Sequence, residues 1–184
     1  MSGTGIVSAA EVVEFWRQAG AEKWFRGGPD FDALCRERLL ATHMAASRAE
    51  LADWEADAGG SLALVLLLDQ IPRNVFRGSA HAYATDPLAR AVAERAIGHG
   101  HDMQAEPGLR FFYYLPFTHS EALLDQQRAV ELHRALEGPD ADKWAVHHHG
   151  IIERFGRFPH RNALFGRAST PVEQAWLEEG GFRG

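Results

Sequence analysis

The segment from Leu68 to Asn74 places a carboxylate, an amide and a guanidinium at the end of the most apolar stretch of the chain. Asp69 and Arg73 are four residues apart, the spacing at which side chains of a helix face each other. Pro72 has no N–H group, so the carbonyl four residues before it is open to a side chain or to water. Because a buried charge needs a partner, the segment indicates either a structural ion pair or a ligand site.

A second polar segment, residues 152–162, alternates arginines with phenylalanines and repeats the Pro-then-Arg-Asn ending of the first segment. Between residues 150 and 167 there are four arginines and one acidic residue. The planar guanidinium of arginine can hold a carboxylate or a phosphate through two parallel hydrogen bonds. We therefore predict that the chain binds an anionic ligand, a peptide carboxylate or a phosphate. The candidate ligand-binding residues are Arg73, Asn74, Arg154, Arg157, His160, Arg161 and Asn162.

An alternative interpretation gives the same arginines a structural role. They can bind the last carbonyls of helices and the side chains of Asp or Glu, and so join neighbouring helices. In this case the polar groups form an interhelical lock, and function lies on an outer surface or at an interface between copies of the chain.

Histidines suggest a third interpretation, an enzyme that uses acid–base chemistry on a small molecule. His119 and Glu121 lie at a predicted helix start, and the helical period turns His148 inward. The candidate catalytic residues are His119 or His148 as general base and Asp69 or Glu121 as the orienting carboxylate. Three consecutive histidines, 147–149, point in directions about 100° apart in a helix, so we predict no metal site.

Sequence motifs of known reactions are absent from the chain. It contains no phosphate-binding Gly-x-x-x-x-Gly-Lys-Ser/Thr, no His-Glu-x-x-His and no Gly-x-Ser-x-Gly. No nucleophile can be identified, and Cys35 is more simply a packing residue. We therefore predict no cofactor and leave open whether the protein is an enzyme.

Composition narrows the class of protein further. The 184 residues are 46% hydrophobic and 24% charged, as in a folded globular domain. A formal net charge of −6 argues against broad binding to nucleic acid or to an anionic membrane. The longest apolar run, Leu62 to Leu68, is far shorter than the roughly 20 residues that span a bilayer. With a single cysteine and no leader pattern, the sequence predicts a cytoplasmic protein.

Hydrophobic residues recur at helical spacing along nearly the whole chain, which predicts an all-α fold in one domain, residues 1–184. Capping-box sequences mark helix starts at Ser8 and Thr170, and the run from Leu62 predicts a central helix surrounded by others. We expect about eight helices in antiparallel hairpins, near residues 8–26, 30–44, 61–76, 86–98, 111–116, 120–136, 139–155 and from 170.

Several motifs carry a resemblance that extends from about Val12 to Leu177. They are Phe15-Trp16, Trp24-Phe25, Leu66–Asn74 with Arg77-Gly78, Thr85-Asp86-Pro87, Tyr114–Phe117 with His119-Ser120-Glu121, and Ile151–Asn162 with Gly166-Arg167 and Ser169-Thr170. In these motifs the sequence resembles an uncharacterised bacterial domain-of-unknown-function family assigned to the tetratricopeptide-like helical superfamily. The resemblance implies a right-handed superhelix of helix pairs and brings no established reaction, substrate or cofactor. His148 matches a family histidine, whereas Gly150 stands where an acidic residue is expected.

Overall fold

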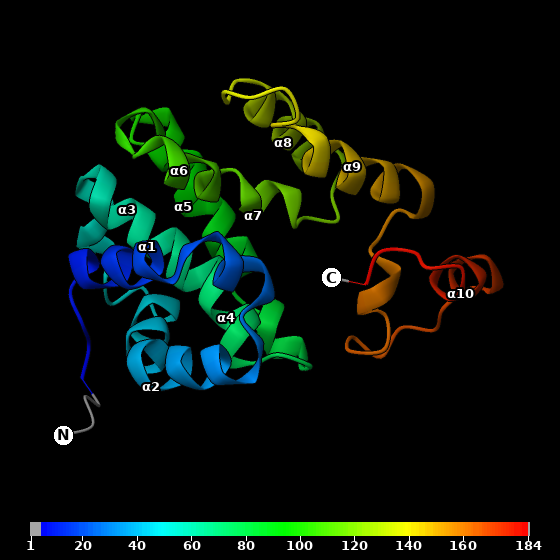
Figure 1. The fold of residues 1–184 in the computed structure, drawn as a ribbon, viewed down its shortest axis with the longest axis horizontal. Helices are drawn as coiled ribbons and strands as arrows, with labels where there is room; N and C mark the ends of the chain where they lie inside the picture. The colour runs from blue at the N-terminus through cyan, green and yellow to red at the C-terminus, as the bar shows by residue number, and fades with distance from the viewer. Residues whose placement is uncertain (1–4, 184) are drawn as a thin grey trace. The chain divides into compact units, whose positions relative to one another are not determined.

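The computed structural model describes residues 5–183, and all regular secondary structure in this part of the chain is helical (Figure 1). The prediction of an all-α fold is therefore confirmed. The chain divides into two compact units, one ending at Pro116 and one beginning at Phe117. The prediction of a single folding domain stays a prediction, because compact units of one chain need not fold independently.

Unit 1 is built around helices α1 (Ala9–Arg26), α2 (Gly28–Ser47), α3 (Ala58–Val65), α4 (Ile71–Val75), α5 (Asp86–Gly98) and α6 (Pro107–Arg110). Short 3₁₀ turns join them at Ala52–Ala56, Ala80–Tyr83, Asp102–Gln104 and Phe111–Tyr113, and α7 (Leu115–Thr118) straddles the boundary between the units.

The predicted start of α1 is confirmed. The Ser8 side chain accepts a hydrogen bond from the Glu11 backbone, and the Glu11 carboxylate accepts one from the Ser8 backbone at 2.8 Å. This pair of bonds satisfies two N–H groups that a helix start would otherwise leave unpaired.

The predicted central helix is present, but it is interrupted. A π-turn, Leu66–Gln70, separates α3 from α4, and the Ile71 N–H donates to the Leu66 carbonyl five residues back. All side chains from Leu62 to Pro72 are buried, as expected for a helix surrounded by others. Each fully buried leucine among them contributes roughly 1.5–3 kcal/mol to stability.

Aromatic packing joins the first two helices to the turn after α6. The Trp16 ring is fully buried and lies 6.3 Å from Trp24, 6.1 Å from Phe31 and 5.7 Å from Phe112, measured between ring centroids. The Trp24 indole N–H donates to the Trp16 carbonyl at 2.6 Å. These contacts fix the end of α1 against the rest of unit 1.

Unit 2 contains α8 (Leu123–Arg134), α9 (Lys143–Phe155), a 3₁₀ turn (Pro159–Arg161) and α10 (Pro171–Glu178), with α8 and α9 packed side by side (Figure 1). Gly156 ends α9 with φ of +67°, a conformation that favours glycine. The capping box predicted at Thr170 is confirmed. A small core of Ile151, Ile152 and Phe158 packs against Phe155, Trp176 and Phe182.

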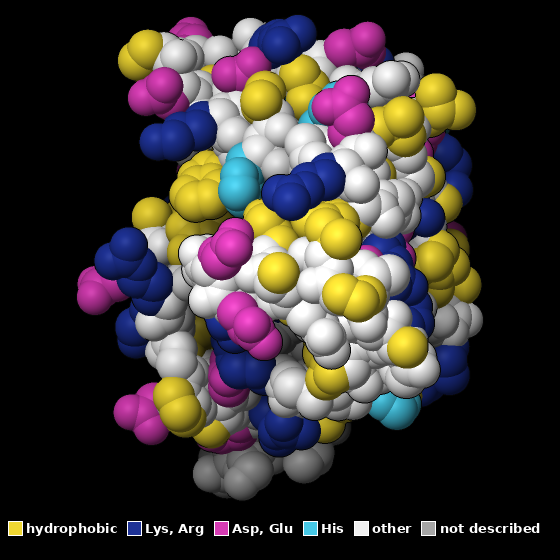
Figure 2. All heavy atoms as spheres, turned by 90° about the vertical axis from the view of Figure 1, so that its right-hand side faces the viewer, with side chains coloured by type: hydrophobic (Ala, Val, Ile, Leu, Met, Phe, Trp, Pro, Cys, Tyr) yellow, Lys and Arg dark blue, Asp and Glu magenta, His cyan; other side chains and the backbone are white. Residues whose placement is uncertain are grey.

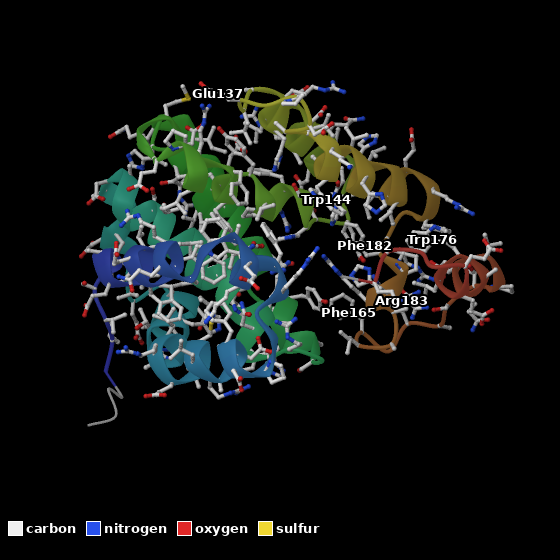
Figure 3. The ribbon with its side chains drawn as sticks, in the orientation of Figure 1. Glu137, Trp144, Phe165, Trp176, Phe182 and Arg183 are labelled. Carbon is white, nitrogen blue, oxygen red and sulfur yellow. The ribbon has the colours of Figure 1, made fainter. Side chains whose placement is uncertain are left out.

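Two predicted boundaries in unit 2 are displaced. The helix expected from Ser120 begins at Leu123, because the Ser120 hydroxyl donates to Asp125 at 2.5 Å and accepts from the backbone two residues on. The next helix begins at Lys143 rather than near residue 139, and Trp144 in its first turn, labelled in Figure 3, is 62% exposed. Among the described residues, no helix is both long and apolar enough to cross a membrane.

Candidate functional site

Four consecutive carbonyl oxygens of the π-turn, those of residues 67–70, each form a hydrogen bond with a side chain. The side chains are His43 on Leu67 (2.8 Å), Thr85 on Leu68 (2.6 Å), Arg73 on Asp69 (2.5 Å) and Asn74 on Gln70 (3.1 Å). Burial lowers the pKa of His43, so its ring is neutral and carries its proton on Nδ1, the atom that faces the carbonyl. The open carbonyl predicted at Leu68 is thus occupied by a threonine hydroxyl.

Arg73 lies between two carboxylates. Its guanidinium donates to both oxygens of Asp86, at 2.9 and 3.0 Å, and lies 3.3 Å from Asp69, whose side chain is fully buried. Asp69 also accepts from the side chain of Gln70 at 2.5 Å. Burial acts to lower the pKa of Arg73, but the two carboxylates outweigh it, so that the pKa is raised. This geometry favours the structural interpretation of Asp69 and Arg73.

The arginines of unit 2 also meet acidic side chains. Arg157 binds both oxygens of the buried Glu173, at 2.6 and 2.8 Å, and Arg167 binds both oxygens of Glu121, at 2.6 and 2.9 Å. The hydrogen bond from Arg157 is the main reason that the pKa of Glu173 falls to about 2. Burial raises the pKa of Glu121, but hydrogen bonds from Arg167 and the Phe158 N–H lower it by more. Both carboxylates are therefore ionised and engaged at neutral pH.

The other ligand-binding candidates of unit 2 lie in the 3₁₀ turn Pro159–Arg161, directly after it, and at the end of α9. Arg161 is buried, donates to the His119 carbonyl at 2.9 Å and covers the Phe158 ring at 4.4 Å. Asn162 is also buried and donates to the Ser169 hydroxyl at 3.1 Å. Burial lowers the pKa of His160 to about 4. Arg154 is exposed and stacks over Phe155 at 4.7 Å.

Of the catalytic candidates, the structure brings His119 and His148 together, with 6.5 Å between their ring centroids. His148 is buried, and burial lowers its pKa to about 3, so the ring is neutral. Its Nδ1–H donates to the Trp144 carbonyl at 2.7 Å, so a backbone group rather than a carboxylate orients the ring. The candidate carboxylate of Asp69 belongs to unit 1, whereas both candidate histidines belong to unit 2. Within residues 5–183 no group of three or more His, Cys, Asp or Glu side chains could hold a metal ion.

Unit 1 carries an open groove of about 400 Å³ between α2 and the end of α4. Its lining residues are Pro29, Asp32, Ala33 and Arg36 from one face of α2, and Asn74, Arg77 and Gly78 from the end of α4 and the turn after it. Gly78 has φ of +78°, which lets the chain turn sharply there.

Two arginines line this groove. Arg36 donates to the carbonyl of Val75 through one terminal nitrogen. Arg77 donates to both oxygens of Asp32, at 2.6 and 2.9 Å, and to the Asn74 side chain at 3.3 Å, through Nε and Nη2. Among the described residues no hydrogen bond is formed by Nε or Nη1 of Arg36 or by Nη1 of Arg77.

Asn74 is a ligand-binding candidate expected from the sequence, whereas Arg36 is not, and Arg77 is named only in a motif that carries the family resemblance. A signal for Arg36 was present, since Pro29, Asp32, Ala33 and Arg36 follow the i, i+3, i+4, i+7 spacing of one helix face. What the sequence could not show is that this face meets the end of another helix.

Comparison with known proteins identifies the family of the chain. The chain belongs to the family described as bacterial protein of unknown function (DUF924), which it matches over residues 12–181. It is also similar to the solved structure of a protein of unknown function, ATU0120, from Agrobacterium tumefaciens. The two chains are 52% identical with a TM-score of 0.90, over 94% of this chain and 97% of the other. A search of curated proteins gives no significant match.

Proposed function

We propose that the protein is a binding module for a small anionic ligand and that the ligand binds in the groove of unit 1. The observation that supports this most directly is the pair of arginines, Arg36 and Arg77, which retain unused N–H donors on an open groove. Arginine donors of this kind recognise carboxylate and phosphate groups. The proposal keeps the ligand class predicted from the sequence. Of the predicted ligand-binding residues it retains Asn74, and it replaces Arg73 and the residues between Arg154 and Asn162 by Arg36 and Arg77.

Charge in the groove is consistent with an anion. Its lining contains two arginines and one aspartate, so these side chains carry a net charge of about +1 at neutral pH. Helix α2 begins next to Pro29, which lines the groove. Within the described part of the chain, no side chain caps the first N–H groups of this helix. The positive end of a helix adds to the attraction of an anion. Figure 2 shows one face of the molecule, on which basic and acidic side chains are interspersed.

The hydrogen bonds and the ion pair beside the π-turn support this function because they hold the groove in shape. Asn74 connects the groove to the π-turn, since it donates to the Gln70 carbonyl and accepts from Arg77. Asn74 and Arg73 both belong to α4, and the ion pair between Arg73 and Asp86 also holds this helix in place. Binding residues on a rigid support lose less conformational entropy when a ligand arrives.

Two finer proposals come from the sequence, one from its single cysteine and one from the family resemblance. We place the protein in the cytoplasm, and we expect its helices to form a tetratricopeptide-like right-handed superhelix, for which α8 and α9, packed together after a short connection, supply one helical hairpin. Acid–base catalysis has less support, because His148 has a low pKa and because, among residues 5–183, a backbone carbonyl and not a carboxylate binds its ring.

The proposal can be tested by titrating the protein with sodium acetate and with inorganic phosphate at constant ionic strength. Nuclear magnetic resonance would follow the arginine Nε–H signals and the backbone amides of α2 and α4. We expect saturable shifts confined to the groove, and their loss in the double variant Arg36→Gln, Arg77→Gln.

A matched control is the double variant Arg48→Gln, Arg95→Gln. It also removes two positive charges, but from exposed arginines that pair with Glu50 and Glu55. Saturable binding that persists in the groove variant, or shifts that never saturate in the wild type, would refute the proposed site. Melting curves of both variants would establish that they are folded.

A further inference from the structure

We infer that the groove of unit 1 selects a carboxylate over a phosphate, an inference that rests on the proposed function of that groove. The selecting residue is Asp32, which lies in the lining with its carboxylate held in place by two hydrogen bonds from Arg77. An anion that enters the groove must therefore bind beside a fixed negative charge.

The position of Asp32 is well determined by its contacts. Its side chain is only 15% exposed, and each of its oxygens accepts from a different nitrogen of Arg77, at 2.6 and 2.9 Å. Two parallel bonds to one guanidinium fix the carboxylate in orientation as well as in position. Asp32 cannot turn away without breaking both bonds.

Charge balance then distinguishes the two classes of anion. The lining side chains carry a net charge of about +1, which a carboxylate neutralises. A phosphate monoester carries about −1.5 to −2 charges at pH 7, so it would leave the groove negative beside Asp32. Specificity of this kind comes from a repulsive group as well as from attractive ones.

Shape indicates a ligand longer than a single carboxylate group. The lining face of α2 runs from Pro29 to Arg36, and the seven residue steps between them correspond to about 10 Å along the helix axis. Between them lies the small side chain of Ala33, beside which an extended molecule could lie. The carboxylate could belong to a free organic acid or to the C-terminal end of a polypeptide.

The test uses the intact protein and four probes at pH 7.5 and constant ionic strength. They are acetate, acetyl-diglycine, acetyl-diglycine amide and methyl phosphate. Acetyl-diglycine and its amide differ only in the terminal group, a carboxylate in one and an uncharged carboxamide in the other, which makes the amide the matched control. Affinities would be measured in the wild type and in Asp32→Asn, with melting curves to show that the variant is folded.

We expect the affinity of the wild type for acetyl-diglycine to be at least about tenfold higher than its affinity for methyl phosphate. We expect the amide of acetyl-diglycine not to bind. In Asp32→Asn this preference should shrink by about threefold or more, because the repulsive charge is gone. Tight binding of acetate itself would identify a free organic acid as the source, and binding of acetyl-diglycine alone would identify a chain end.

Two different failures can be told apart. If methyl phosphate binds the wild type as tightly as acetyl-diglycine, or if Asp32→Asn leaves the preference unchanged, the inference about Asp32 is wrong while the anion site stands. If neither anion gives saturable binding, or if the amide binds as well as the acid, the proposed function itself is wrong.

Discussion

Replacing Arg73 by leucine tests whether the buried ion pairs beside the π-turn hold unit 1 together. Arg73 binds both oxygens of Asp86 and lies 3.3 Å from Asp69, and these acidic side chains are only 8% and 0% exposed. Removing one partner of a buried pair leaves uncompensated charge, at a cost of about 3–5 kcal/mol. The Arg73 side chain is itself 19% exposed, so we expect the lower end of this range, about 3 kcal/mol.

Arg95→Leu is the control for this experiment. Arg95 also donates two hydrogen bonds to one carboxylate, that of Glu55, at 2.6 and 2.7 Å. Its side chain, however, is 52% exposed, and exposed pairs contribute about 0–1 kcal/mol. The two variants therefore remove pairs of similar geometry that differ in burial.

Urea denaturation followed by tryptophan fluorescence would measure both costs. With an m value of about 2 kcal/mol/M, the loss in Arg73→Leu corresponds to a midpoint lower by about 1.5 M. A shift no larger than that of Arg95→Leu would refute the argument from burial. Adding Asp69→Asn and Asp86→Asn to the Arg73 variant should restore part of the stability, because no buried charge then lacks a partner.

Three further changes have outcomes that follow from the structure. Thr85→Val should lower the free energy of unfolding by about 1–3 kcal/mol in urea denaturation, because a buried carbonyl loses its donor, whereas Thr85→Ser should keep most of it. The folded-state pKa of His148 is lowered to about 3, so the unfolded chain takes up a proton first as the pH falls below about 6.5. Stability should then fall by up to about 1.4 kcal/mol per pH unit towards pH 4, and His148→Gln should flatten this slope in denaturation curves at several pH values. Gly60→Ala should lower the melting temperature, since a Cβ there would lie 2.1 Å from the Trp54 carbonyl, while Gly59→Ala, which meets no atom closer than 3.4 Å, should not.

Local sequence signals predicted much of the fold. The capping box at Ser8 and the one at Thr170 both begin helices where expected. The uninterrupted apolar run from Leu62 to Leu68 correctly marked the buried central segment, because only a helix surrounded by others can bury every side. Such signals act within a few residues of the chain and need no knowledge of tertiary contacts.

The partners of the polar residues could not be predicted in the same way. Proline at position 72 indicated an open carbonyl, but its donor, Thr85, lies 17 residues from Leu68. Arg167 finds Glu121 across 46 residues. The groove is formed by Arg36 and Arg77, which no sequence pattern joins. Pairings of this kind depend on how helices pack, and the periodicity of a single helix carries no information about them.

The π-turn also determines the rotational phase of everything that follows it in α4. Each residue of a helix advances the direction of the side chains by about 100°, and a π-turn accommodates one residue more than an α-helical turn does. If the same residues, Leu66 to Gln70, formed a regular α-helix instead, α4 would therefore be turned by about a quarter of a revolution. Arg73 would then point away from Asp86, and Asn74 would leave the groove. The π-turn thus accommodates one extra residue in the central segment and keeps the side chains of α4 directed at their partners.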